Sequence, residues 1–460
     1  MLKNMMLCMA AIIWLQTIAL ANDNYFRINK IEIVGNKKTK PNIIFREMMV
    51  QQNDSLSYYT IIEKIESSKR NLFNTFLFNK VDIEIIDSTL SSLNLKVIVA
   101  ERWYTYPLPI MEIADRNFNV WWVEQHHDIR RLNAGVALLK RNIRGRNETL
   151  TLIAQTGYTR QLGVQYEFPF MDKKMQKGVQ IYSGYYQNKE VASQTINNKQ
   201  IFLKDYSQFI KTRWQVGAIF RYRPGIFLRH SIELNFTKNN IADTLANSVP
   251  DYLLDGKKNQ QFTFVKYIFE ADHRNIKAYP LKGYLCTITA TRWGLLTFDN
   301  VNMTEATVLI SKYSQLTKTL FLYNSIKLKT SLPEHQPYNI QRAFGYGYDY
   351  VRGYEYYVID GQHFGLLRNE IKWQILDYKL QSPIKKVEEQ PFKIYLKSFF
   401  DMGYVKDNFY FKNNSFNNKV INGYGFGLDV HTFYDIVVRF EITRNHTGNT
   451  GVYLHYKANI

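Results

Sequence analysis

The sequence predicts a transmembrane antiparallel β-barrel of about 16 strands, preceded by a small α+β domain. Three observations predict this fold. Aromatic residues make up 15% of the chain, with 33 Tyr and 29 Phe, and membrane barrels carry aromatic girdles at both interfaces. Past residue 21, no apolar run approaches the roughly 18 residues of a membrane-spanning helix. From Glu101 onward, alternating segments are separated by turn clusters, as in barrel strands.

Residues 1–21 are expected to form a secretory signal peptide. Lys3 precedes an apolar run from Met5 to Leu20, and Ala19-Leu20-Ala21 matches a small-x-small cleavage site. The alternative is an N-terminal membrane anchor, for which the run is short and is interrupted by Gln16.

Residues 22–102 are predicted to form a separate α+β domain with the order strand, helix, helix, strand, strand. The first strand alternates over residues 30–33 and stops at Gly35-Asn36, a turn signal. The remaining elements are helices over 41–50, starting with Pro41, and over 59–73, with apolar positions Ile61, Ile62, Ile65 and Leu72, followed by strands over 81–85 and 93–99.

Residues 103–460 contain sixteen candidate barrel strands. They cover residues 104–113, 132–141, 149–153, 162–168, 179–186, 212–222, 226–236, 262–271, 284–291, 307–312, 319–329, 364–374, 392–404, 423–430, 436–443 and 451–456. Each crosses a bilayer with roughly 9–11 residues. The long polar stretches around 189–204, 239–259 and 331–361 are the expected extracellular loops.

The net charge of +19 lies almost entirely in the predicted barrel. Residues 26–101 carry 11 basic and 9 acidic residues, and residues 1–25 are balanced by Lys3 and Asp23. Lumen and loop surfaces that face anionic lipid headgroups or acidic glycans would explain the excess. We therefore expect membrane lipid as a partner and no nucleic acid.

Enzyme motifs are missing from the sequence. It has no Gly-x-Ser-x-Gly elbow, no Walker-type loop, no zinc-spaced Cys/His set and no Rossmann glycine motif. His126-His127-Asp128 is the one metal-like cluster, but adjacent strand residues point to opposite faces, and we interpret it as a loop without a ligand role. We expect no enzymatic activity, no catalytic residues, no cofactor and no metal site.

The element order of residues 22–102 resembles a POTRA domain. Gly35-Asn36 closes the first strand, Leu77-Phe78-Asn79-Lys80-Val81 opens the second, and Glu101 ends the third. This resemblance implies a single periplasmic module whose exposed sheet edge accepts an extended strand from a client or partner. The alternative is a small α+β spacer.

Four motifs of the barrel region occur together. They are Val351-Arg352-Gly353-Tyr354, Phe399-Phe400-Asp401-Met402-Gly403, Asn369-Glu370-Ile371-Lys372, and Asp272-His273-Arg274-Asn275 with Pro280-Leu281-Lys282-Gly283. Together they resemble the BamA/TamA superfamily of outer-membrane assembly and translocation proteins, in which the first motif lies in the sixth extracellular loop and the second on a late strand. Asn275 stands where the family usually has Asp, so an ion pair of Arg274 there is in doubt, though Asp272 remains.

The resemblance implies a loop that folds back into the barrel lumen. An unpaired Arg352 guanidinium would be costly in that partly desolvated space, so it needs a carboxylate. Asp401 lies on an alternating strand that must point one face inward, and Glu370 is a second candidate. Gly353 and Gly403 would let loop and wall approach closely. The alternative is a solvated Arg352 and an Asp401 in a turn.

The C-terminal segment fits the assembly signal of such barrels. Asn449 to Tyr456 matches a polar-x-Gly-x-x-hydrophobic-x-hydrophobic pattern through Gly451, Leu454 and Tyr456, followed by a short tail. The alternative is a last barrel strand with no further role, which has the same alternation.

The family resemblance implies an insertase or translocase in a Gram-negative outer membrane that assembles or exports client proteins. Its N-terminal domain would lie in the periplasm, where residues 22–102 could bind periplasmic or lipoprotein accessory subunits. The seam between the first and last strands would be weakly paired, so that its edges can be offered to a client. The alternatives are a passive outer-membrane channel or surface receptor, and a structural tether for a periplasmic partner.

Overall fold

A computed structural model of the chain describes residues 25–89, 91–380, 390–432 and 436–457. The expected signal peptide, residues 1–21, lies outside this part of the chain. The described residues divide into two compact units between Arg102 and Trp103. Among these residues, no helix is both long enough and apolar enough to cross a membrane.

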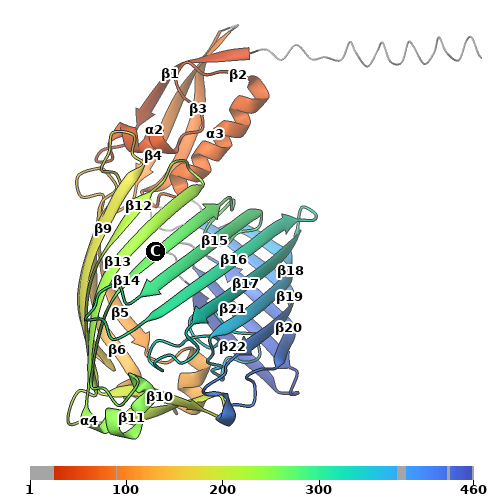
Figure 1. The fold of residues 1–460 in the computed structure, drawn as a ribbon. Coiled ribbons are helices and arrows are strands. Elements are labelled where there is room, and N and C mark those ends of the chain that lie inside the picture. The colour runs from red at the N-terminus through yellow and green to blue at the C-terminus, as the bar shows by residue number, and fades with distance from the viewer. Residues whose placement is uncertain (1–24, 90, 381–389, 433–435, 458–460) are drawn as a thin grey trace, which may run out of the picture. The chain divides into compact units, whose positions relative to one another are not determined.

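The N-terminal unit is a four-stranded sheet with two helices (Figure 1). Its elements are β1 (Tyr25–Val34), α2 (Pro41–Glu47), β2 (Ser55–Ser57), α3 (Tyr58–Phe73), β3 (Phe78–Ser88) and β4 (Ser92–Glu101). The sheet order is β2-β1-β4-β3, with β1 parallel and β3 antiparallel to β4. The order expected from the sequence is confirmed, and the short β2, which the sequence analysis did not predict, is added beside the start of β1.

The core of this unit lies between α3 and the sheet. Ile61, Ile65 and Leu72 of α3 are buried, at the i, i+4, i+11 spacing of one helix face. Ile62, which the sequence analysis placed on the same face, is 39% exposed because it is rotated about 100° from Ile61. Among the described residues of this unit, β3 pairs with β4 alone, so the second edge of β3 is open there.

The second unit is one sheet of sixteen antiparallel strands (Figure 1). The strands are β5 (Thr105–Ile113), β6 (Leu132–Arg141), β7 (Thr149–Gly157), β8 (Thr159–Phe168), β9 (Lys177–Asn188), β12 (Lys211–Tyr222), β13 (Leu228–Ile241), β14 (Asn259–Asp272), β15 (Gly283–Trp293), β16 (Met303–Gln315), β17 (Leu320–Leu332), β18 (His363–Leu380), β19 (Gln390–Lys406), β20 (Val420–His431), β21 (Val437–Asn445) and β22 (Thr450–Lys457). Each of the sixteen candidate segments overlaps one strand, so the number and order of strands are confirmed.

Alternation along the strands separates an apolar outer face from a polar inner face. On β13, Ile232 and Leu234 are exposed, whereas Ser231 and Asn235 are buried. Exposed apolar side chains on one face and buried polar ones on the other are the arrangement of a barrel in lipid. The fold is therefore the transmembrane antiparallel barrel that the sequence predicts.

The long connections gather at one end of the barrel, because consecutive antiparallel strands alternate in direction. The connection after β9 contains a hairpin of β10 (Glu190–Ile196) and β11 (Lys199–Lys204), and the one after β13 contains α4 (Asp243–Ser248). The sequence analysis expected loops here and missed both elements. Residues 333–362 connect β17 to β18 at the same end. Thr195 of β10 donates to Asp360 of that connection at 2.6 Å, so these loops pack on one another.

The two ends of the sheet are β5 and β22. Within the described residues, β5 pairs with β6 alone and β22 pairs with β21 alone (Figure 1). A closed barrel would join these two strands, so the seam that the sequence analysis expected between the first and last strands is where the ladder stops.

Candidate functional site

The connection from β17 to β18 folds back against the inner wall of the barrel. We call residues 333–362 the lumen loop. Arg352 is at its centre and is only 4% exposed. Its contacts are with side chains of β18, β19 and β21, so the loop crosses the inner face of the late strands.

Arg352 is held by the two carboxylates that the sequence analysis expected. Its Nε donates to Asp401 Oδ2 at 2.7 Å, and its Nη2 donates to Asp401 Oδ1 at 2.5 Å. Its Nη1 donates to Glu370 Oε1 at 2.6 Å. The backbone N–H of Arg352 also donates to Asp401 Oδ2, at 3.2 Å. Asp401 is thus bound in the two-pronged geometry that makes arginine–carboxylate pairs strong and directional.

The guanidinium also has an aromatic neighbour and a third carboxylate. Its central carbon lies 3.8 Å from the ring centre of Phe399, which precedes Asp401 by two residues on the inner face of β19. Glu441 Oε1 of β21 lies 3.6 Å from Nη1. Sequence reasoning included Phe399 in a motif without giving it a role, and it did not name Glu441. Strand alternation could have found Phe399, since it shares the face of Asp401.

Small residues let the loop lie directly on the strands. Gly353 has φ +93°, which favours glycine, and its carbonyl accepts from Asn445 Nδ2 at 2.9 Å. A Cβ at Gly403 would press into the side chains of Val351 and Phe344. A Cβ at Gly423, which the sequence analysis did not name, would collide with the carbonyl of Arg352.

The loop is also fixed by apolar packing. Val351 and Tyr354 are buried in a cluster whose other buried members are Ala343, Phe344, Ile359, Phe364, Leu366, Val405 and Ile421. The hydroxyl of Tyr354 is hydrogen-bonded to Nδ1 of His446, which lies in the connection between β21 and β22. The whole tetrapeptide from Val351 to Tyr354 therefore contacts the barrel.

A second set of charges continues the network along the wall. Lys397 of β19 lies 2.7 Å from Asp429 and 2.6 Å from Glu441, and Lys372 lies 3.1 Å from Glu370. Sequence reasoning missed Lys397, Asp429 and Glu441 as site residues. With Asp401 taken as inward, a period of two places Lys397 inward, but nothing in one sequence shows which inward residues of other strands lie opposite it.

Asp272, the last residue of β14, forms an ion pair with Arg274 of the same motif. Arg274 Nε donates to Asp272 Oδ1 at 2.8 Å, and Nη2 donates to Oδ2 at 2.8 Å. Asn275 instead accepts from the backbone N–H groups of Leu281 and Lys282, both at 3.1 Å. Asn at position 275 in place of Asp therefore leaves the pair of Arg274 with Asp272 intact, and the Asn275 side chain orders the turn.

The C-terminal motif lies in β22, the last strand. Gly451, Leu454 and Tyr456 pair with Thr443, Phe440 and Val438 of β21. At the opposite end of the sheet, β5 contains Pro107 and Pro109, which pair with Leu138 and Val136 of β6 without a bulge. Among the described residues, the C-terminal motif thus lies on one unpaired edge of the sheet and the two prolines on the other.

His126 and His127 lie in the connection from β5 to β6, both with positive φ. Asp128 accepts from Arg130 Nε and Nη2 at 3.0 and 2.8 Å. The carboxylate of this sequence cluster is therefore used locally.

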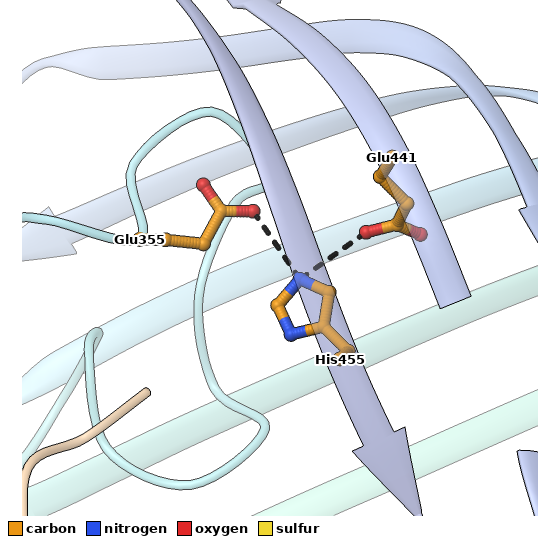
Figure 2. A group of neighbouring side chains, drawn as sticks. All are labelled: Glu355, Glu441 and His455. Atoms are coloured by element: carbon orange, nitrogen blue, oxygen red, sulfur yellow. Dashed lines mark ion pairs between the residues drawn. The ribbon is translucent and has the colours of Figure 1, made fainter. Parts of the chain in front are cut away.

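A different group of potential metal ligands is assembled by the fold (Figure 2). Glu355 of the lumen loop, Glu441 of β21 and His455 of β22 point toward one another, with ligand atoms that all lie within 4.8 Å. Burial raises the pKa of the Glu355 carboxyl to about 8. Sequence reasoning missed this group because its members lie on three separate segments.

Comparison with known proteins agrees with the motifs. Residues 142–433 match the Omp85 superfamily domain, and residues 26–102 match the POTRA domain described as a surface antigen variable number repeat. The outer membrane protein assembly factor BamA of Neorickettsia risticii (strain Illinois) is 38% identical over 77 residues. The aligned stretch covers only 17% of this chain and 10% of that protein.

Two solved structures share the fold across nearly the whole chain. BamA from Haemophilus ducreyi lacking POTRA domains 1–3 has a TM-score of 0.54 at 12% identity, covering 94% of this chain and 83% of that one. CdiB from Escherichia coli has a TM-score of 0.50 at 11% identity, covering 95% and 91%.

The Omp85 match spans well over half of the sequence, and the POTRA match covers the N-terminal unit. Such proteins are outer-membrane barrels with periplasmic POTRA domains, so residues 103–460 lie in the outer membrane and residues 26–102 in the periplasm. The chain belongs to the Omp85 superfamily.

Proposed function

We propose that this protein assembles or translocates other proteins at the outer membrane, as an insertase or translocase. One observation carries the proposal: in the part of the chain that the structure describes, the sixteen-stranded sheet ends in two strands that are each paired on one side only, next to a wall braced by a buried loop. Membership of the Omp85 superfamily supports it, as does the similarity to a protein named as an outer-membrane assembly factor.

Unpaired strand edges are costly inside a membrane, because lipid offers no hydrogen bonds. We therefore expect an unpaired strand edge in a membrane where a strand of another protein pairs with it. A client that is itself a barrel or an exported segment can add to β22 or β5 by backbone pairing, as in other forms of strand addition. No covalent step is required, which fits our expectation that the protein is not an enzyme.

The lumen loop would keep the wall in shape while the seam opens. Arg352 joins Asp401 of β19 to Glu370 of β18, and its third carboxylate neighbour is on β21. These strands lead up to β22, the strand at the seam. A brace across them would let the edge move without collapse of the lumen.

The N-terminal unit and the outer face of the barrel would bind further partners. The open edge of β3 would receive an extended strand from a client or from a periplasmic or lipoprotein accessory subunit. The apolar outer face would contact membrane lipid, and no nucleic acid would take part.

Site-specific photocrosslinking tests the proposal. A photoreactive residue would replace Met111 of β5 or Val452 of β22, which are 85% and 67% exposed. The matched control is Ile310 of β16, which is 47% exposed but lies on a strand paired on both sides. In living cells we expect newly made outer-membrane or exported proteins to be trapped from the two edge positions and not from the control.

Other outcomes would favour the alternatives. Equal capture at all three positions, together with unchanged levels of outer-membrane and surface proteins after depletion, would overturn the proposal. Loss of a periplasmic complex alone on depletion would indicate a tether, and uptake of a solute alone would indicate a channel or receptor.

A further inference from the structure

Glu355, Glu441 and His455 meet where the lumen loop touches the last two strands (Figure 2). His455 Nε2 lies 3.3 Å from Glu441 Oε2 and 3.9 Å from Glu355 Oε1. Both carboxylates are 2% exposed, and the histidine side chain is 19% exposed. Three potential ligand atoms therefore surround one point behind the seam.

Each carboxylate already has one oxygen anchored and presents the other. Glu355 Oε2 accepts from the backbone N–H of Gly353 at 2.7 Å. Glu441 Oε1 faces Lys397 at 2.6 Å and Arg352 at 3.6 Å. The remaining oxygens, Glu355 Oε1 and Glu441 Oε2, are the ones that face His455. Outer contacts that orient the ligands in this way are typical of metal sites.

The inner atoms are buried without adequate partners. Within the described residues, neither Glu355 Oε1 nor His455 Nε2 makes a hydrogen bond of good geometry, and His455 Nε2 faces Glu441 Oε2 and Glu355 Oε1 only as ion pairs of 3.3 and 3.9 Å. A buried carboxylate oxygen without a donor is costly. A cation that accepts lone pairs from both atoms would remove that cost.

The spacing suits a small transition-metal ion. Zinc binds histidine nitrogen and carboxylate oxygen at about 2.0–2.2 Å, which places tetrahedral ligand atoms about 3.4 Å apart. The separations of 3.3 and 3.9 Å are close to this value, so a rotamer-scale contraction would complete three ligands.

The group is also open to solutes from one side. A cavity of about 600 Å³ is lined by Glu355 and His455, together with Glu112 of β5 and Leu454 of β22. It supplies both an entry path and space for a water molecule as fourth ligand. Because residues of both terminal strands line it, the cavity belongs to the seam.

We propose that Glu355, Glu441 and His455 form a binding site for a divalent first-row transition-metal ion of the Zn²⁺ class. One imidazole and two carboxylates match the ligand preferences of zinc and its neighbours. Calcium and magnesium take oxygen ligands and make no use of the imidazole. The bound ion would connect the lumen loop to β21 and β22.

The site has a consequence that rests on the proposed function. An ion held by residues of the loop and of β22 would hold the last strand against the lumen wall. Its removal would release this link and leave β22 held by its ladder with β21. Metal occupancy would therefore favour the closed seam and reduce client capture at the β22 edge.

Zinc binding by the purified full-length protein in detergent tests the site itself, without any client. The variants are Glu355→Gln and His455→Asn, and the control is His126→Asn, which removes a histidine that lies outside the group in a conformation that asparagine tolerates. Glu441 is left unchanged because it also faces Lys397 and Arg352. The protein carries no histidine tag, and each sample is checked for the heat-dependent gel mobility of a folded barrel.

We expect one Zn²⁺ per chain for the wild type and for His126→Asn, by calorimetry and by metal analysis after dialysis. Each ligand variant should bind at least about 100-fold more weakly, since even an outer-contact change costs about 10–100-fold. Mg²⁺ and Ca²⁺ should not compete. Folded wild type without stoichiometric zinc, or ligand variants that bind as the wild type does, would overturn the site.

The seam consequence has a separate readout. Adding Zn²⁺ should lower photocrosslinking from Val452 in the wild type and leave His455→Asn unaffected. If zinc binds as expected but client capture does not respond, the metal site stands and its link to the seam fails. If no client is captured under any condition, the proposed function fails and the binding result is untouched.

Discussion

Arg352 is the residue on which the lumen loop depends. Its guanidinium is almost fully buried, and a buried charge is tolerated only when it is paired and hydrogen-bonded. Asp401 takes two of its N–H donors and Glu370 takes a third. A lysine could not do this, because an ammonium lacks the planar fork that binds one carboxylate with two parallel hydrogen bonds.

Breaking this pair should damage the barrel. We expect Arg352→Asp to lower the free energy of unfolding by about 3–5 kcal/mol, because it puts a third carboxylate beside buried Asp401 and Glu370 and removes the guanidinium that they share. Asp401 would keep only the longer contact with Arg368 at 3.8 Å, and Glu370 its contact with Lys372 at 3.1 Å. Adding Asp401→Arg should restore only part of the loss, since the new carboxylate at position 352 would face Glu370 and Glu441. Denaturant unfolding in micelles, followed by tryptophan fluorescence, measures both.

Arg352→Lys is the conservative control and should be intermediate, because it keeps the charge and loses the fork. If Arg352→Asp were as stable as the wild type, the loop would be held by its apolar cluster alone. Full recovery in the double variant would show that Asp401 is the only partner that matters.

Among the strands, β5 is unusual in carrying two prolines. Proline has no N–H, so in a sheet its nitrogen must face away from the partner strand. Pro107 and Pro109 are two residues apart and therefore direct their nitrogens to the same side. Their ladder with β6 is continuous, so that side is the free edge at the seam. The edge of β5 lacks two donors that another strand would need.

Restoring these donors should close the seam. We expect Pro107→Thr with Pro109→Val to add two backbone hydrogen bonds across it, each worth about 1 kcal/mol. Hydrogen exchange of the β22 amides, followed by mass spectrometry, should slow by several-fold, and crosslinking of clients at Val452 should fall.

Met111→Thr is the matched control, because it changes an exposed side chain of β5 and adds no backbone donor. It should leave both readouts at the wild-type level. Unchanged exchange in the double variant would mean that something other than the missing donors keeps β5 and β22 apart.

At the scale of the molecule, the long loops of the barrel pack on its inner wall and on one another. The lumen loop lies on the inner wall. Its residues 358–360 contact the β10–β11 hairpin and the connection from β19 to β20. Asn198, in the turn between β10 and β11, joins both. Its backbone N–H donates to Asn414 Oδ1 at 2.7 Å, and its side-chain amide donates to the carbonyl of Val358 at 3.3 Å. Interlocked loops of this kind are unsuited to a freely open channel.

The conductance of the purified protein in planar bilayers should therefore be low. Arg352→Ala should raise it several-fold, because the loop loses its hold on the wall. Arg221→Ala is the control: it removes a cation that binds Glu167 at 2.7 Å on β8, away from the loop. A large conductance in the wild type that Arg352→Ala leaves unchanged would favour the passive-channel alternative.

Sequence patterns predicted the elements well. Alternation gave all sixteen barrel strands, since each strand crosses lipid on its own and must show one apolar face whatever lies beside it. The family motifs indicated Arg352, Asp401 and Glu370, which the structure brings together. The β10–β11 hairpin and α4 were missed. Contacts with other loops stabilise these elements, and their own residues show no clear hydrophobic periodicity.

The amino-acid sequence by itself determined the barrel, the small domain before it and the cation of the lumen loop, because periodicity, composition and local motifs are properties of single segments. The tertiary structure alone decided which inward side chains meet. Lys397, Glu441 and His455 became neighbours of the loop only through the register of β19, β21 and β22 and the path of residues 333–362. Burial and distance are relations between segments, and they appear when the strands pair and the loop folds back.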